Sequence, residues 1–119
     1  MKKMADKTLF QKIMTGDIPS DILYEDEYCI VIKDIAPQAP THLLIIPRKA
    51  IPMLANASTD DKSLLGHLLL VATDTAKQLG IEEAFRIIIN NGVEAGQTVF
   101  HLHLHLLGNK KFLENNLSF

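Results

Sequence analysis

The sequence predicts one α+β domain, with a mostly antiparallel sheet of about five strands, one long helix and one short helix. Two observations lead to this prediction. Short β-branched and aromatic runs recur between turn residues, and one amphipathic stretch, residues 58–80, is long enough to form a helix that covers the sheet. At 119 residues the chain has the length of one ordinary domain, so we expect residues 1–119 to form a single unit.

The short helix is expected near the start of the chain. Thr8 and Gln11 have the spacing of a capping box, in which each side chain bonds to the backbone of the other residue. Apolar residues follow at helical spacing until Gly16 and Pro19, which end the run.

Three strands are expected next. Residues 22–24 and 28–32 are β-branched and aromatic runs on either side of an acidic turn, which predicts a hairpin. Residues 34–40 contain two prolines and form a loop. Residues 42–46 then resume as a strand, which Pro47 ends.

The long helix is expected between Ser58 and Gly80. Ser58 or Thr59 is a typical N-cap, and the glycine is a typical C-terminal stop. His67 falls on the outer side of the helix, which favours a surface side chain. The apolar stripe that faces the sheet comprises Leu64, Leu65, Leu68, Val71, Ala72, Ala76 and Leu79.

Composition excludes several classes of partner. Twelve basic and fourteen acidic residues leave a net charge of -2 without a basic stripe, so no nucleic acid is expected as a ligand. No apolar run is long enough to cross a membrane. The single Cys29 cannot form an internal disulfide, and residues 1–7 do not resemble a secretory signal. We therefore expect a soluble, cytoplasmic protein.

Two strands are predicted at the end of the chain. Residues 85–89 are the fourth strand, and the short loop at residues 90–97 favours an antiparallel pair with the fifth. The fifth strand contains the stretch VFHLHLHLLG, residues 99–108, in which three of the five histidines occupy alternate positions. Alternation along a strand puts His101, His103 and His105 on one face, which we expect to be an accessible surface or cleft. The residues on the opposite face would be Phe100, Leu102, Leu104 and Leu106.

Three interpretations of the histidines compete. The first is a polar strand face without chemistry, for which histidine is an uncommon choice. The second is a metal site. His101 and His105 would lie about 13 Å apart along an extended strand at roughly 3.3 Å per residue, so all three histidines could not easily bind one ion. A further ligand would have to come from another part of the chain, and His42 is the candidate.

The third interpretation is nucleophilic attack on phosphorus by the middle imidazole. The loop before the strand favours it, because glycines followed by a hydroxyl residue can present backbone N–H groups to phosphate oxygens. The residues concerned are Gly92, Gly96, Gln97 and Thr98. A metal site would have no use for such a loop.

The sequence His-Leu-His-Leu-His-Leu-Leu resembles the signature of the histidine-triad (HIT) superfamily, in which histidines alternate with apolar residues. The rest of the chain is similar to the Hint branch, the purine nucleoside phosphoramidases, from about residue 8 to residue 108, which leaves 109–119 as a tail. The matching segments are residues 10–13, 18–19, 34–35, 37–42, 46–49, 64–68 and 96–101.

This resemblance implies a HIT-like fold and hydrolysis of the phosphorus–nitrogen bond of adenosine or guanosine 5'-phosphoramidates. The reaction would pass through a nucleotidyl-histidine intermediate on His103, without a metal or other cofactor. His101 and His42 would orient the reacting groups, and Asp34 would accept hydrogen bonds from the ribose hydroxyls. Asn90, Gly96, Gln97, Thr98 and Val99 would surround the phosphate, with His105 as a further donor. Phe10, Ile13, Ile18, Ile32 and Ile35 would form the slot for the base.

Simpler roles exist for some of these residues. Asp34 has the position of a turn residue before Pro37, and Cys29 that of a small core residue. Two other functions also stay open, a nucleotide-binding regulator with incidental turnover and a histidine metal site.

The resemblance further implies a homodimer formed through the long helix and the strand at residues 85–89. The tail lacks the tryptophan of many animal relatives, which leaves the preferred leaving group open.

Overall fold

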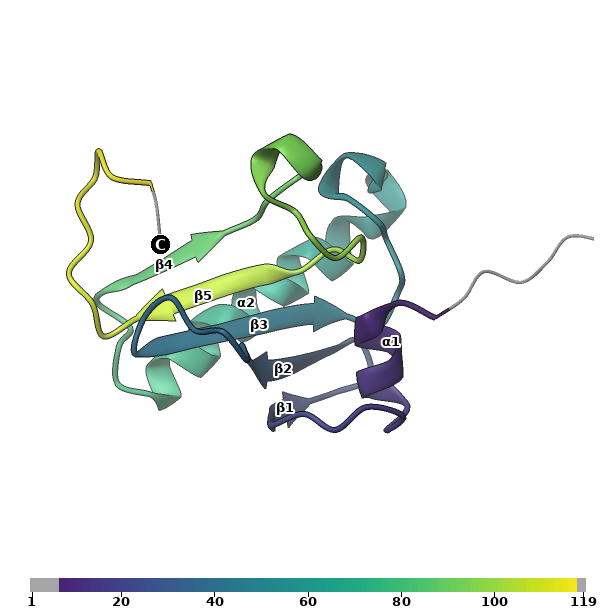
Figure 1. Cartoon of the computed structure of the whole chain (residues 1–119), viewed down its shortest axis with the longest axis horizontal. Coiled ribbons are helices and arrows are strands. Elements are labelled where there is room, and N and C mark those ends of the chain that lie inside the picture. Colours follow the sequence, from purple (N-terminus) through teal and green to yellow (C-terminus); the bar gives the residue numbers. More distant parts are fainter. Residues whose placement is uncertain (1–6, 118–119) are drawn as a thin grey trace, which may run out of the picture.

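The computed structural model describes residues 7–117, and the expectations for residues 1–6 and 118–119 lie outside it. It contains one five-stranded antiparallel sheet with the order β1-β2-β3-β5-β4 (Figure 1). The α+β class and the strand pairings predicted from the sequence are confirmed. The strands are β1 (Ile22–Glu25), β2 (Cys29–Lys33), β3 (Thr41–Pro47), β4 (Phe85–Ile88) and β5 (Leu104–Gly108), and the helices are α1 (Leu9–Met14) and α2 (Lys62–Gln78). Single 3-10 turns occur at η1 (Leu54–Asn56), η2 (Thr59–Asp61) and η3 (Val93–Ala95).

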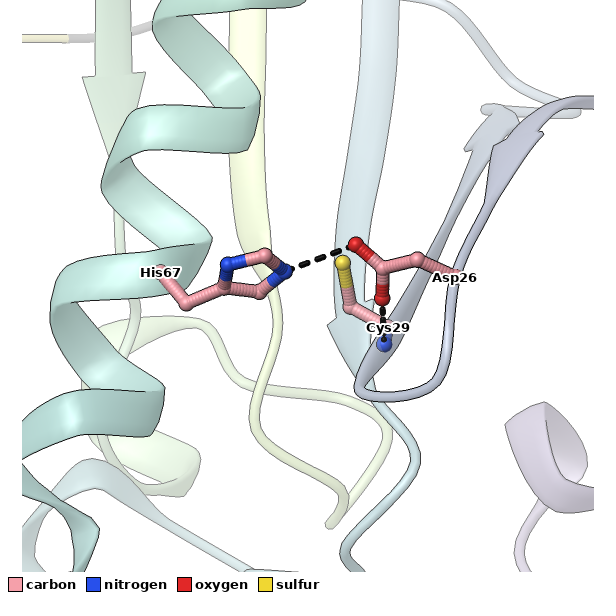
Figure 2. Close-up of side chains that lie close together, drawn as sticks. All are labelled: Asp26, Cys29 and His67. Carbon is pink, nitrogen blue, oxygen red and sulfur yellow. Dashed lines mark hydrogen bonds and ion pairs between the residues drawn. The ribbon is translucent and has the colours of Figure 1, made fainter.

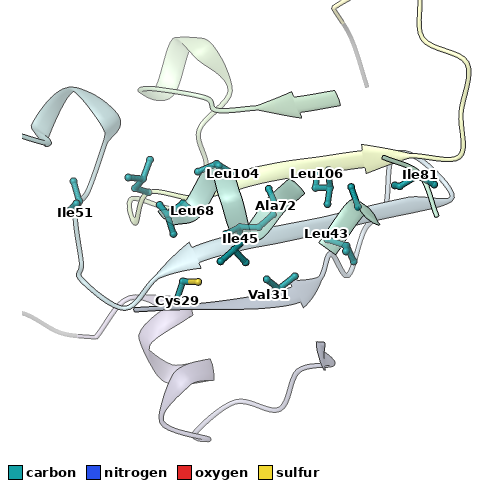
Figure 3. Close-up of a cluster of buried hydrophobic side chains, with 13 residues drawn as sticks. Cys29, Val31, Leu43, Ile45, Ile51, Leu68, Ala72, Ile81, Leu104 and Leu106 are labelled. Carbon is teal, nitrogen blue, oxygen red and sulfur yellow. The ribbon is translucent and has the colours of Figure 1, made fainter. Parts of the chain in front are cut away.

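Alternation along the inner strands divides the core between two faces of the sheet. On one face, side chains such as Val31, Leu43 and Ile45 pack against helix α2 (Figure 3). On the other face, side chains such as Ile30 and Leu44 pack against the short helix α1. A fully buried aliphatic side chain stabilises a fold by about 1.5–3 kcal/mol. Because several such side chains lie on each face, both faces of the sheet are held firmly against their helices.

Helix α1 begins with the predicted capping box. The backbone N–H of Gln11 donates to Oγ1 of Thr8 at 3.1 Å, and the Thr8 N–H donates to Oε1 of Gln11 at 2.8 Å. The helix ends before Gly16, whose φ of 81° lies in the left-handed region that glycine tolerates. Phe10 and Ile13 are the buried residues of this helix and hold it against the sheet.

Helix α2 starts later than its sequence pattern suggests. Ser58 caps the 3-10 turn η2, and Oδ2 of Asp61 accepts the Ser58 N–H at 2.9 Å. The expectation that Leu79 faces the core was wrong, because the helix ends at Gln78 and Leu79 is 45% exposed. No helix within residues 7–117 has the length and apolar character needed to cross a membrane.

The histidine stretch differs from the predicted strand. Strand β5 begins only at Leu104, and its pairing with β3 ends at the Ile45–Leu104 pair. Pro47, just beyond that pair on β3, has no N–H to extend the ladder, and the Leu102 N–H donates instead to the carbonyl of Ile51 at 2.6 Å. His101 and His103 therefore precede the strand.

One further expectation about this stretch was wrong. Phe100 is 42% exposed and lies outside the core, although Leu102, Leu104 and Leu106 are buried as expected. Of the surface or cleft expected at the histidines, the structure has a cleft, which His103 and His105 line, and His101, His103 and His105 are 0%, 7% and 9% exposed. Their chemistry is therefore set by protein partners more than by water.

The described part of the tail folds back over the edge strand β4. The guanidinium of Arg86 donates to the carbonyl oxygens of Asn116 and Leu113, at 2.8 and 2.9 Å. It also lies 4.6 Å from the centre of the Phe112 ring, a cation–π contact. One arginine on β4 thus holds the tail.

Candidate active site

A pocket of about 330 Å³ lies on the α1 side of the sheet, a size typical of small-molecule sites. Most of its wall is apolar, and its polar groups are few. Of the residues predicted to bind substrate or act in catalysis, ten line it, namely Phe10, Ile13, Ile18, Ile32, Asp34, Ile35, Thr98, Val99, His103 and His105. Leu9, Pro19, Ser20, Lys33 and Leu44 also line it and were not predicted, although Pro19 lies in a segment that matches the resemblance.

His103 has a defined tautomer. Its Nδ1 lies 2.8 Å from the backbone carbonyl of His101. A carbonyl oxygen only accepts, so Nδ1 carries the proton and Nε2 keeps its lone pair. The ring is held edge-on to Phe10, with centroids 5.0 Å apart. Burial lowers the pKa of His103 from 6.5, opposed by the His101 hydrogen bond and by Asp34, so the ring is neutral at pH 7.

His105 has the opposite tautomer, which follows from its contact with His42. Nδ1 of His42 accepts the backbone N–H of Gln38 at 3.0 Å, so the His42 proton is on Nε2. That Nε2–H donates to Nδ1 of His105 at 2.9 Å, and the proton of neutral His105 is therefore on its Nε2. Burial lowers the pKa of His105 to about 4, and the neighbouring His103 and His42 add to the effect.

The two rings stand 5.0 Å apart, centre to centre. His103 provides a nucleophilic nitrogen, and His105 provides an N–H donor beside it. A phosphoryl group bound between them would meet both an electron pair and a hydrogen-bond donor, which is the arrangement that nucleophilic displacement at phosphorus requires.

Asp34 forms the turn expected from the sequence and also lines the pocket. Its Oδ1 accepts the N–H of Ala36 at 2.8 Å, which is the expected turn. Its Oδ2 lies 3.4 Å from Nε2 of His42, and the residue also lines the pocket. The turn therefore presents a carboxylate to the site.

The loop before the histidines is held from inside by Gln97. This side chain is 3% exposed, accepts the Gly92 N–H at 2.8 Å, and donates to the carbonyls of Pro52 and Val99 at 2.8 and 3.0 Å. Gly92 and Gly96 have φ values of 91° and 94°, where other residues are strained. Gly96, Gln97 and Asn90 are not among the residues that line the pocket, whereas Thr98 and Val99 are.

Within residues 7–117, two groups of side chains bring three potential metal ligands within 4.8 Å of one another. One group is Asp34, His42 and His105, at the pocket. The other is Asp26, Cys29 and His67. The three histidines of the alternating stretch do not form such a group in this part of the chain.

The second group lies on the α2 side of the sheet and joins the β1–β2 turn to the long helix (Figure 2). Oδ1 of Asp26 accepts the N–H groups of Tyr28 and Cys29, each at 2.8 Å. Oδ2 accepts the Tyr24 hydroxyl at 2.8 Å and Nε2–H of His67 at 2.7 Å. Burial opposes ionisation of Asp26, but these four hydrogen bonds together hold its pKa below the usual value.

His67 is therefore not the plain surface side chain expected from the sequence. Its side chain is 34% exposed, and it forms both the Asp26 bond and an edge contact with the Tyr28 ring. Sequence periodicity placed it on the correct helix and near the edge of the stripe, but could not reveal a partner 41 residues away. Cys29 is fully buried in the core, as expected.

Known proteins resemble this chain over most of its length. Residues 15–112 match the HIT domain family. A HIT-like protein of Synechocystis is 55% identical over 109 residues, which are 92% of this chain and 96% of the relative. A HIT family hydrolase from Legionella pneumophila Philadelphia 1 superposes with a TM-score of 0.89 at 41% identity, covering 92% of this chain and 98% of the other. A histidine triad nucleotide-binding protein from Candida albicans gives 0.76 at 32% identity, over 92% and 86% of the two chains.

Proposed function

The chain belongs to the HIT domain family, and on this premise we propose that it is a purine nucleoside phosphoramidase. It would cleave the phosphorus–nitrogen bond of adenosine or guanosine 5'-phosphoramidates. The observation that carries the proposal is the pair of opposite tautomers at His103 and His105, beside an apolar pocket. The names of a hydrolase and a nucleotide-binding protein among the similar structures support it.

The proposed reaction has two steps. Nε2 of His103 attacks phosphorus, the P–N bond breaks, and the nitrogen leaves as an amine that takes up a proton from water. Water then attacks the phosphorus of the nucleotidyl-histidine, and nucleoside monophosphate, a proton and neutral His103 result. Charge on the phosphoryl oxygens would be stabilised by Nε2–H of His105 and by the loop that ends at Val99. We expect no metal or other cofactor to be required.

The pocket accounts for the other parts of the nucleotide. Apolar side chains from α1 and β2, among them Phe10, Ile13 and Ile32, would hold the base. The carboxylate of Asp34 would accept from the ribose hydroxyls. Asn90, Gly96, Gln97 and Thr98 would act at the phosphate, the first three by shaping the loop, because they do not line the pocket.

The test is turnover by the purified chain. Adenosine and guanosine 5'-phosphoramidates are incubated with enzyme, and release of the nucleoside monophosphate is followed by chromatography, with dinucleoside polyphosphates as competing candidates. Rapid acid-free quenching of a radiolabelled substrate should trap label on the protein, and the label should be absent from His103→Ala. Binding of adenosine monophosphate without cleavage of any phosphoramidate would instead indicate a nucleotide-binding regulator.

A metal-dependent function is a second candidate because Asp34, His42 and His105 bring three ligand atoms within 4.8 Å. Two of these groups already bond to one another, which favours the metal-free reaction. Stoichiometric zinc or iron in protein purified without added metal, together with loss of turnover on chelation, would favour the metal-dependent function.

We further propose a cytoplasmic homodimer that forms through α2 and β4. Leu69 and Leu70 of α2 are 47% and 65% exposed, and β4 is an edge strand of the sheet. Exposed apolar side chains and an unpaired strand edge are each typical of a surface that another chain covers. Sedimentation at micromolar concentration checks the dimer, and a monomeric mass would contradict it.

A further inference from the structure

The hydroxyl of Thr8 connects helix α1 to the histidines. Oγ1 of Thr8 lies 2.7 Å from Nδ1 of His101, a residue 93 positions later in the chain. The same oxygen accepts the Gln11 N–H at the start of α1. One side chain therefore caps the helix and contacts the first histidine of the alternating stretch.

The direction of the Thr8–His101 hydrogen bond follows from the other side of the ring. Nε2 of His101 lies 2.7 Å from the carbonyl oxygen of Pro47, which can only accept. The ring proton of neutral His101 is therefore on Nε2. Nδ1 has a lone pair, and the Thr8 hydroxyl must donate to it.

We propose that Thr8 is a positioning residue, whose hydroxyl fixes the tautomer and the neutral state of His101 and thereby the position of His103. The ring of His101 is fully buried between its two partners, so it has no water with which to exchange these bonds. A donor at Nδ1 and an acceptor at Nε2 together suit only neutral imidazole with its proton on Nε2.

The consequence for His103 passes through the backbone. The carbonyl of His101 accepts Nδ1–H of His103 at 2.8 Å, so any rotation of residue 101 moves the acceptor that orients the nucleophile. Keeping His101 neutral also keeps a positive charge away from His103, whose nucleophilic form is neutral.

Helix α1 adds a second connection. Phe10, two residues after Thr8, has edge contacts with the rings of both His101 and His103, at 5.7 and 5.0 Å between centroids. The same Phe10 lines the pocket. The Thr8 hydroxyl thus couples the pocket wall and the histidines, which no contact within β5 could do.

Two matched variants separate capping from positioning. Thr8→Ser keeps both the cap and the donor. Thr8→Asp keeps a good N-cap but replaces the donor by a carboxylate, which only accepts and so favours a proton on Nδ1 of His101. Gln11→Ala is the helix control, because it removes the returning cap bond and leaves the Thr8–His101 contact in place.

The first measurement is the nitrogen NMR spectrum of the histidine side chains. Its signals are assigned with variants in which one histidine at a time is replaced. We expect His101 of the wild type and of Thr8→Ser to carry its proton on Nε2 alone at pH 7, and that of Thr8→Asp to gain a proton on Nδ1. A wild-type His101 with its proton on Nδ1 would overturn the proposal without any variant having to fold.

The second measurement is turnover, and this part rests on the proposed function. We expect Thr8→Asp to lower kcat by about 10- to 100-fold, the size of effect that misplacement of a reacting group produces. The fall of its kcat at acidic pH should also begin at a higher pH than in the wild type. Thr8→Ser and Gln11→Ala should stay within about 3-fold of wild type. If folded Thr8→Asp turned over substrate as fast as the wild type, the inference about Thr8 would be overturned and the proposed function would stand. If the wild type cleaved no phosphoramidate, the proposed function would be overturned, and the NMR result would decide the role of Thr8.

Discussion

Within residues 7–117, histidines belong to two clusters of polar side chains, one on each side of the sheet, and the clusters differ in what holds the imidazole ring. His103 and His105 are held by neutral partners, a backbone carbonyl and another imidazole. In each ring the bond to that partner is made by Nδ1, so the second nitrogen is Nε2. His67 instead donates to the carboxylate of Asp26, which is also bonded to the β1–β2 turn (Figure 2). Neutral partners fix the tautomer of an imidazole that can act as a nucleophile or a donor, whereas a carboxylate partner uses the imidazole to join two elements. The first cluster should therefore govern turnover and the second stability.

The largest effect should follow from replacing His103. Because no other group in the pocket has an equally placed lone pair, His103→Ala should lower kcat by at least about 1,000-fold while adenosine monophosphate still binds. His101→Ala should retain more activity, since it removes an orienting group only. Steady-state kinetics and calorimetry make the comparison, and near wild-type turnover by folded His103→Ala would refute the central assignment.

Asp34 should have the next largest effect. Asp34→Asn keeps an oxygen that can accept the Ala36 N–H but loses the negative charge that, in the proposed function, accepts from the ribose hydroxyls, so kcat/KM should fall about 10- to 100-fold, mainly through KM. A substrate lacking both ribose hydroxyls serves as the control, because it should lose the same factor with the wild type and little more with the variant. Equal losses from the variant with both substrates would contradict ribose recognition.

The second cluster should respond in stability instead. Asp26→Asn removes a charge that accepts four hydrogen bonds, which should cost about 2–3 kcal/mol of unfolding free energy without a change in turnover per folded molecule. Denaturant titration and kinetics of the same samples test both parts. A large loss of kcat at full folding would break the division between the clusters.

The same carboxylate predicts how stability depends on pH. The pKa of Asp26 is below 3.8 in the folded chain, so the unfolded chain binds more protons as the pH falls below about 4. Its contribution is complete above that pH and is lost toward lower pH. Denaturant titrations between pH 5 and pH 2 should show a steeper loss in the wild type than in Asp26→Asn, and parallel curves would be evidence against this source of stability.

The smallest effect is expected in how far the turnover rate falls when the pH is lowered. Because burial lowers the pKa of His103 from 6.5, the neutral nucleophile persists below that pH. The midpoint of the fall in activity with acid should therefore lie below pH 6.5, measured against an enzyme-free blank for acid hydrolysis of the substrate. A midpoint at or above pH 6.5 would mean that His103 is not shielded as the structure indicates.

Local patterns were sufficient for most of the fold. The Thr8–Gln11 capping box, the hairpin across the acidic turn and the apolar stripe of α2 each depend on residues close in sequence, and each was predictable from them. Wherever a contact joins distant segments, local patterns failed. Strand β5 begins at Leu104 because Pro47, two residues beyond Ile45 on β3, cannot extend the ladder past the Ile45–Leu104 pair, and alternation of residue types cannot reveal where that pairing stops.

By itself the sequence determined the α+β class, the three alternating histidines and two strand pairings, β1 with β2 and β4 with β5. Only the tertiary structure decided what each imidazole can do. Tautomers depend on whether the nearest partner donates or accepts, and those partners, Pro47 and Thr8 for His101, His42 for His105 and Asp26 for His67, come from other elements of the chain. A hydrogen-bond partner many residues away leaves no trace in local periodicity, and for that reason the tautomers of His101, His105 and His67 could be stated only after the chain was folded.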